Sequence, residues 1–125
     1  STALPPAVCA AAAAALQVIF NEPERRRTLA ARSAFARRLL QENELDVIAA
    51  PPESPIIAVL LHDDAIAVQV SRQMAAHGFF VPAVRPPTVA AGTSRLRISV
   101  CCDHLEDQIR SVVYQLRDVI NSEQR

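Results

Sequence analysis

An alanine-rich segment near the N-terminus constrains the fold of this 125-residue chain more than any other feature. Residues 7–16 are apolar throughout, and the apolar run continues to Phe20 with only Gln17 between. Pro5 and Pro6 preset the backbone of a helix start, and alanine has the strongest helix propensity. Small side chains on every face let another part of a protein approach closely, so this helix needs a large partner surface. A single domain of this size offers few such places.

The composition argues against several classes of partner. Hydrophobic residues make up 50% of the chain and charged residues 21%, which is typical of one globular domain. The 13 basic residues equal the 13 acidic ones, so no net charge attracts the chain to nucleic acid or an anionic membrane. The apolar segment is also shorter than the roughly 20 residues that span a bilayer. Every basic residue is arginine, and without lysine no side-chain amine can form a Schiff base.

The cysteine pattern predicts a reducing compartment. Cys9, Cys101 and Cys102 cannot all pair within one chain, and adjacent cysteines have poor geometry for a normal disulfide. We therefore expect a cytoplasmic protein. The first residue is serine rather than methionine, and no basic segment precedes the apolar run, so we expect a cut or processed start and no secretory signal.

A second helix is expected from Asn21 to about Asn43. Asn21, with Glu24 three residues on, has the spacing of a capping box at the start of that helix. The many arginines of the segment predict a solvated face, and an anion site is the alternative. These residues are Arg25, Arg26, Arg27, Arg32, Arg37 and Arg38.

Two strands and a helix are expected in the middle of the chain. After a proline-bounded turn, residues 56–61 form a continuous apolar run, which predicts a buried strand. Asp63 can cap a helix that stops at Gly78 in a left-handed conformation. Residues 79–84 predict another strand, and residues 47–49 an additional edge strand.

The clearest periodicity lies in the last third of the chain. Residues 95–100 alternate strictly, with apolar side chains facing one way and polar side chains the other. Asp103 and Glu106 predict a capping box for a last helix, whose apolar stripe would cover a sheet. The expected fold is α/β, of the α+β sandwich type: a small mixed or antiparallel sheet with helices on one face, preceded by the alanine-rich helix. The strand alternates Leu96, Ile98 and Val100 with Arg95, Arg97 and Ser99, and the stripe comprises Leu105, Ile109, Val112, Val113, Leu116, Val119 and Ile120.

The polar face of the 95–100 strand is the first candidate for a functional surface. Arg97 lies in mid-strand, where a side chain is held rigidly, and its planar guanidinium suits two-point binding of a carboxylate. Arg95 shares that face, and for both the alternative is a surface arginine on an open sheet. The loop 85–94 holds rigid prolines next to Thr88, which would present one hydroxyl with little entropy to lose. It is equally suited to be a structural connector.

Other reactive side chains form no recognisable site. Cys101, Cys102 and His104 are close in sequence, but their spacing matches no metal site, and adjacent strand residues point to opposite faces. We therefore expect no metal. His62 and His77 flank the middle helix, where we expect them at the surface or stabilising the helix ends. No set of nucleophile, base and orienting acid follows from the spacing, and two glycines provide no phosphate-binding loop.

The segment 85–98 carries a family resemblance. It reads Arg-Pro-Pro-Thr-Val-Ala-Ala-Gly-Thr-Ser-Arg-Leu-Arg-Ile and closely resembles the signature near the C-terminus of the α-oxoamine synthases. These are pyridoxal-phosphate enzymes that condense an amino acid with an acyl thioester. The Arg-Pro-Pro-Thr-Val opening resembles most the biotin-pathway branch of the family. Residues 1–7 are similar to the segment that begins the helix between its large and small domains. Ala90 departs from the pattern, since the family commonly has proline there.

The resemblance implies the C-terminal small domain of a fold-type-I enzyme. Residues 1–20 would be the linking helix and residues 21–125 the small domain. In the family the cofactor lysine lies upstream, in a large domain that is absent from this chain, which agrees with the lack of lysine here. This isolated chain is therefore expected to be inactive.

Site residues are implied by matching positions in the signature. Arg97 matches the arginine that holds the amino-acid carboxylate, and Thr88 matches a threonine at the substrate site. Arg85 belongs to the loop that closes over the acyl substrate. Ser1 and Thr2 match hydroxyl positions that, in relatives, reach the phosphate of pyridoxal phosphate in the neighbouring subunit. No catalytic residue and no metal ligand is implied within this chain.

The implied reaction condenses L-alanine with a pimeloyl thioester, with decarboxylation, in biotin biosynthesis. The implied partners are the chain's own large domain and a second subunit of a homodimer, with no nucleic acid and no membrane. The alternative from another class is a stand-alone, non-catalytic α/β-sandwich module that binds or regulates. The balanced charge, the absence of lysine and the small size of this chain all allow that alternative.

Overall fold

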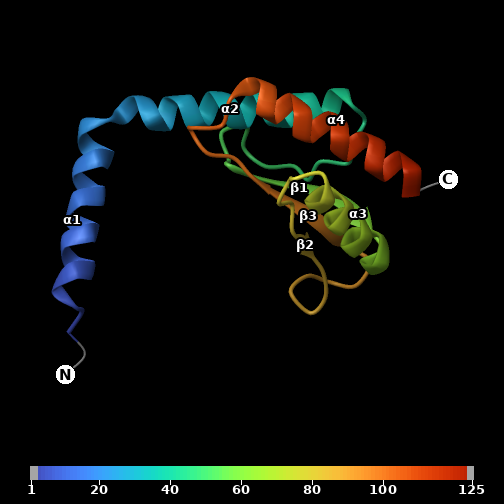
Figure 1. The fold of residues 1–125 in the computed structure, drawn as a ribbon, viewed down its shortest axis with the longest axis horizontal. Helices are drawn as coiled ribbons and strands as arrows, with labels where there is room; N and C mark the ends of the chain where they lie inside the picture. The colour runs from blue at the N-terminus through green and yellow to red at the C-terminus, as the bar shows by residue number, and fades with distance from the viewer. Residues whose placement is uncertain (1–2, 124–125) are drawn as a thin grey trace.

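The computed structural model describes residues 3–123 and has an antiparallel sheet with helices packed on one face (Figure 1). The strand order is β1-β3-β2, and β3 runs antiparallel to both neighbours. The expected α/β fold with a small sheet is therefore confirmed. In chain order the elements are α1 Pro6–Asn21, α2 Pro23–Glu42, β1 Ile56–His62, α3 Asp64–Ala76, β2 Ala83–Val84, β3 Ser94–Ser99 and α4 Glu106–Glu123.

The alanine-rich helix α1 extends away from the rest of the molecule (Figure 1). None of its residues is buried, and Phe20 at its end is 77% exposed. No helix within residues 3–123 is both long enough and apolar enough to cross a membrane. The described part of the chain does not cover this helix. This agrees with the expectation that the helix needs a partner surface.

The expected cap of α2 at Asn21 is wrong. Helix α1 continues through Asn21, and Glu22 occupies the junction without a side-chain cap. Pro23 then starts α2, because a proline at the first helical position has a suitable φ and lacks only an N–H that would have no helical partner. Glu22 accepts a hydrogen bond from Arg25, and this bond together with the negative charge raises the pKa of Arg25.

The expected solvated arginine face of α2 is wrong at Arg37. This side chain is only 6% exposed, and its terminal nitrogens donate to the carbonyl oxygens of Ile48 at 3.2 Å and Ile56 at 3.4 Å. Arg37 therefore joins α2 to the middle of the connection that leads into β1 and to the first residue of β1. Four arginines are exposed as expected: Arg25, Arg26, Arg27 and Arg38.

The pairing of β1 with β3 separates a core face from an outer face. The core-facing pairs are Ile57 with Ile98 and Val59 with Leu96, and the outer pairs are Ala58 with Arg97 and Leu60 with Arg95. The expected burial of β1 is met at Ile57 and Val59 but not at Ile56, which is 54% exposed, and burial alternates along the strand. The helices cover one face only, so every second side chain of β1 remains partly exposed.

Strand β2 has two residues and is shorter than the expected strand over 79–84. The backbone N–H of Arg97 donates to the carbonyl of Pro82 at 2.9 Å, which extends the ladder by one bond. Pro82 has no N–H with which to return a bond, so the pairing ends there. The edge of β3 beyond Arg97 is therefore left uncovered by β2.

The expected edge strand over 47–49 is reduced to an isolated bridge between Val47 and Val59. Two backbone hydrogen bonds flank it, from Leu60 N–H to the carbonyl of Asp46 at 2.8 Å and from Ile48 N–H to the carbonyl of Ala58 at 2.9 Å. The chain then turns at residues 51–54, which ends the pairing.

The start and stop signals of α3 are confirmed. One carboxylate oxygen of Asp63 accepts from the N–H of Ala65 at 2.8 Å and of Ile66 at 2.9 Å. These bonds satisfy two of the donors that a helix leaves unpaired at its start. Gly78 follows the helix with φ +85°, which is the left-handed conformation expected of it.

The expected capping box of α4 at Asp103 is wrong. The backbone N–H of Cys101 donates to Nδ1 of His104 at 3.2 Å, and this turn delays the helix start to Glu106. Gln108 then caps the helix by accepting from the N–H of Leu105 at 2.9 Å. Leu105 precedes the helix and is 59% exposed, so it does not join the apolar stripe. The buried stripe is Ile109, Val113, Leu116, Val119 and Ile120.

Helix α4 contributes a central part of the core, so truncation there should be costly. Leu116 is 0% exposed, and we expect Leu116→Ala to lower the free energy of unfolding by about 2–5 kcal/mol through lost burial and a cavity. Urea unfolding of both forms measures it. The same substitution at exposed Leu105 is the control and should cost less than about 1 kcal/mol. Equal effects at the two positions would contradict the burial pattern.

The two aspartates near helix starts should differ in their contribution to stability. Asp63→Ala removes both cap bonds of α3 and should cost about 0.5–2 kcal/mol. Asp103→Ala removes no helix cap and should stay within about 0.5 kcal/mol of the parent. Thermal unfolding of the two variants side by side distinguishes them, and a larger loss for Asp103→Ala would contradict this assignment of caps.

Candidate functional site

Arg97 lies on the outer face of the sheet, in the middle of β3. Its backbone is fixed on one side by pairing with Ala58 of β1 and on the other by its bond to Pro82. The side chain is exposed. Within residues 3–123 its guanidinium forms no hydrogen bond or ion pair, so all its donors are available to a ligand. A fixed backbone with an available planar donor group suits the capture of a carboxylate.

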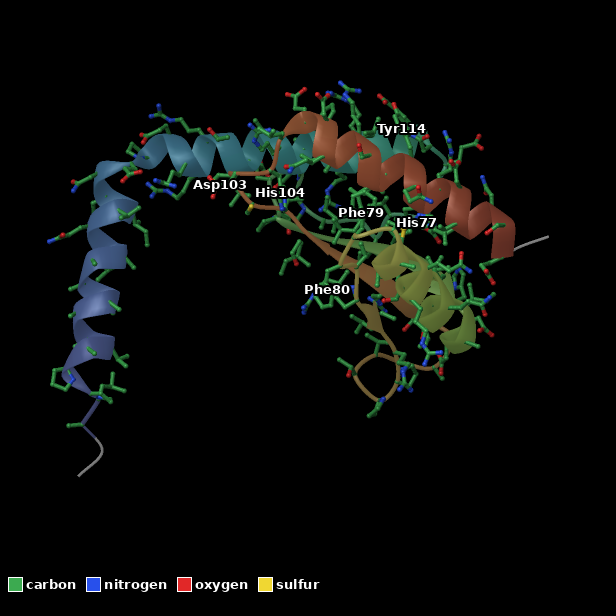
Figure 2. All side chains as sticks on the ribbon, viewed as in Figure 1. His77, Phe79, Phe80, Asp103, His104 and Tyr114 are labelled. Carbon is green, nitrogen blue, oxygen red and sulfur yellow. The ribbon has the colours of Figure 1, made fainter. Side chains whose placement is uncertain are left out.

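A cavity of about 530 Å³ lies at the uncovered edge of β3, and Arg97 is one of its lining residues. Apolar walls with a few polar groups are typical of small-molecule sites. In Figure 2, Phe79 lies on the side of the chain toward α4 and Phe80, which is 90% exposed, on the opposite side. The lining includes Phe79, Phe80, Pro82, Ser99, His104 and Gln108.

Thr88 and Arg85 both lie in the loop that connects β2 to β3, which projects from the sheet on the side away from α2 and α4 in Figure 1. The N–H of Thr88 donates to the carbonyl of Arg85 at 3.1 Å, and the Pro86–Pro87 peptide bond between them is cis. Both side chains are exposed. No hydrogen bond within the described chain joins either of them to Arg97. The three expected substrate residues therefore share one strand-loop-strand unit but are not in direct contact.

Arg95 differs from Arg97 in a way that the sequence did not indicate. Its Nε donates to the carbonyl of Thr93 and its Nη2 to the hydroxyl of Thr93, both at 2.9 Å. Arg95 is therefore engaged with the loop, whereas Arg97 is available. The spacing shows only that Thr93, Arg95 and Arg97 lie on the same side of an extended chain, and it does not distinguish the two arginines.

Two further contacts hold the same end of the loop. His62 has φ +63°, and its Nδ1 lies 3.2 Å from the carbonyl of Gly92. The hydroxyl of buried Ser94 donates to a carboxylate oxygen of Asp64, at the start of α3. The expected surface or end-stabilising role of His62 thus extends to a link with the loop. His77 is the C-cap residue of α3, as expected for a residue at that helix end.

The side chains of Cys101, Cys102 and His104 are close in sequence but are not arranged as a set of metal ligands. Nδ1 of His104 accepts from the backbone of Cys101, so one ring nitrogen is used within the turn. Cys9, Cys101 and Cys102 are all unpaired thiols. Across residues 3–123, no group of three histidine, cysteine or acidic residues is placed to hold a metal ion.

The residues expected to touch pyridoxal phosphate, Ser1 and Thr2, lie outside the described residues. The sequence contains no lysine, so the covalent link of that cofactor cannot come from these 125 residues. The side chains described here therefore do not make up a pyridoxal-phosphate site. What they offer is an available guanidinium at a cavity and an exposed hydroxyl on the neighbouring loop.

The sequence matches the family Aminotransferase class I and II over residues 1–116. It is 40% identical over 120 residues to the 8-amino-7-oxononanoate synthase of Saccharophagus degradans and 42% identical over 122 residues to that of Methylocella silvestris. Both matches cover 96% of this chain but only 30% and 32% of the relatives. The chain thus spans less than a third of the length of these curated relatives.

Solved structures share the fold. The serine palmitoyltransferase of Sphingomonas wittichii matches with a TM-score of 0.89 at 28% identity, and SPT with PLP with 0.90 at 27%. Each match covers 98% of this chain and 31% of the other. The 8-amino-7-oxononanoate synthase of Francisella tularensis has a TM-score of 0.83 at 24% identity, over 99% of this chain and 36% of that one. The fold and the resemblance inferred from residues 85–98 are confirmed.

Proposed function

This chain belongs to the aminotransferase class I and II family, and we propose that it is the C-terminal part of an 8-amino-7-oxononanoate synthase. The curated relatives of that name, at 40% and 42% identity, support this branch. In the proposal, residues 1–20 are the linking helix and residues 21–125 the small domain of a longer, homodimeric enzyme. Its partners would be its own large domain and the second subunit.

The proposed reaction condenses L-alanine with a pimeloyl thioester, with loss of carbon dioxide, in biotin biosynthesis. Pyridoxal phosphate, held by the large domain, supplies an electron sink for the charge that develops at the α-carbon of the amino acid. Because the chain has no lysine, we propose that it is inactive by itself. Its three unpaired cysteines are compatible with the cytoplasm.

The available guanidinium of Arg97 at the cavity is the observation that carries the proposal. Its planar donor group would bind both oxygens of the amino-acid carboxylate. Since β3 is paired through Ala58 and Pro82, the anchor itself would be held in place. Orienting the amino acid before reaction reduces the entropic part of the barrier.

The loop residues have supporting roles in the proposal. The hydroxyl of Thr88 would hydrogen-bond the substrate, and Arg85 would close over the acyl chain. Both are exposed and lie on a turn stiffened by prolines. Ser1 and Thr2 would reach the cofactor phosphate of the neighbouring subunit.

The exposure of α1 supports a longer protein. The six large apolar side chains of residues 4–20 are between 41% and 77% exposed. Apolar area of this extent is typical of a surface that another part of a protein covers. In the proposal the large domain provides that cover, which agrees with the short span of this chain on its relatives. These side chains are Leu4, Val8, Leu16, Val18, Ile19 and Phe20.

Replacing Arg97 tests the carboxylate role. In the full-length enzyme we expect Arg97→Met to raise the KM for L-alanine about 10- to 150-fold, because charge-assisted hydrogen bonds of about 1.5–3 kcal/mol are lost. Steady-state kinetics with varied L-alanine and saturating acyl thioester measure this. Arg38→Met, at an exposed position of α2, is the matched control and should leave KM near its parent value. An unchanged KM in Arg97→Met would refute the role.

The mass of the native protein tests whether the chain is part of a longer enzyme. An antibody against this domain, used on an extract of the source cells, should detect a species several times heavier than 13.6 kDa. The physical reason is the uncovered apolar surface of α1, which requires a partner. A native species of 13.6 kDa would contradict the proposal and favour the stand-alone binding or regulatory module.

A further inference from the structure

The contacts of Arg95 form a chain of hydrogen bonds that enters the loop between β2 and β3. Nη2 of Arg95 donates to the hydroxyl of Thr93 at 2.9 Å, and that hydroxyl donates to the carbonyl of Ala90 at 2.7 Å. The backbone N–H of Thr93 donates to the same carbonyl at 3.2 Å. Hydrogen bonds linked in series polarise and strengthen one another. This relay therefore connects a residue of β3 to a backbone group two residues beyond Thr88.

The second donor of Arg95 adds rigidity to this relay. Its Nε donates to the carbonyl of Thr93 at 2.9 Å, so the planar guanidinium contacts Thr93 at two points. A two-point contact from a planar group fixes orientation as well as distance. Lysine carries the same charge but cannot reproduce it.

The other contacts at this end of the loop do not reach as far. His62 contacts the carbonyl of Gly92, and Ser94 bonds Asp64. The first acts on Gly92, near the end of the loop, and the second on Ser94, the first residue of β3. Among the side-chain hydrogen bonds of the described residues, only those of Arg95 and Thr93 reach back toward Ala90, which is two residues along the chain from Thr88.

The two outer-face arginines of β3 therefore have different partners. Arg95 is half-buried and bonded to the loop, whereas Arg97 is exposed and lines the cavity. We propose that Arg95 is a positioning residue that holds the C-terminal half of the 85–94 loop, through Thr93 and Ala90, and thereby restrains the loop segment that carries Thr88. The substrate part of this inference rests on the proposed function, and the anchoring part does not.

Hydrogen–deuterium exchange of the full-length protein without substrate tests the anchoring. We expect Arg95→Met and Thr93→Val each to speed exchange of the hydrogen-bonded amides within residues 88–93, those of Thr88 and Thr93, about tenfold, because each breaks the relay. Arg95→Lys should resemble Arg95→Met, since it keeps the charge and loses the two-point contact. Thr93→Ser keeps the hydroxyl and should retain slow exchange. The double variant Arg95→Met with Thr93→Val should be no faster than either single variant.

Kinetics test the consequence for substrate binding. Arg95→Met should raise the KM for the amino acid about tenfold and change kcat less, since it displaces a substrate contact and leaves the reacting groups intact. Exposed Arg38→Met is the control for both measurements. The thermal unfolding midpoint of each variant separates loop loosening from general destabilisation, which would speed exchange throughout the chain instead of within residues 88–93.

Two results would overturn the inference. Unchanged exchange of residues 88–93 in Arg95→Met would show that the relay does not hold the loop, whatever the enzyme does. Faster exchange with an unchanged KM would show that the held loop does not serve the substrate site. An unchanged KM in Arg97→Met is a separate result that refutes the carboxylate role of Arg97 and leaves the exchange test of Arg95 valid.

Discussion

The antiparallel pairing of β1 with β3 sets which face of the sheet each side chain of these two strands points toward. In this register Ile98 and Leu96 face the helices, so Arg95 and Arg97 necessarily face away from them. A shift of one residue would bury both guanidinium groups without partners, at a high desolvation penalty. The apolar side of β3 thus stabilises the fold and, by the same pairing, fixes the polar side as the outer face of the sheet.

Pro82, the residue just before β2, connects the fold to the candidate site. Because Pro82 cannot donate, pairing stops and the edge of β3 beyond Arg97 borders the cavity. The following loop leaves the sheet and returns to it at Ser94, where three side chains hold it. The missing N–H of Pro82 therefore leaves a cavity open next to β3, the strand that carries the available guanidinium of Arg97.

Much of the fold followed from local patterns. The helix starting at Pro6, the cap at Asp63 and the alternation of β3 are all set by neighbours in sequence, and each was confirmed. The caps expected at Asn21 and Asp103 failed, because the preceding helix or turn extended past them. Arg37 was expected to be solvated and is buried, because two carbonyls distant in sequence accept its hydrogen bonds.

The sequence by itself determined the element types, the two faces of β3, the family and the candidate residues Arg97, Thr88 and Arg85. These depend on side-chain volume, periodicity and a contiguous signature, all of which follow directly from the order of the residues. Only the tertiary structure decided which of Arg95 and Arg97 is available to a ligand. The reason is physical: a guanidinium bonds to whichever acceptors the fold places within about 3 Å of it, and spacing along a sequence does not give that distance.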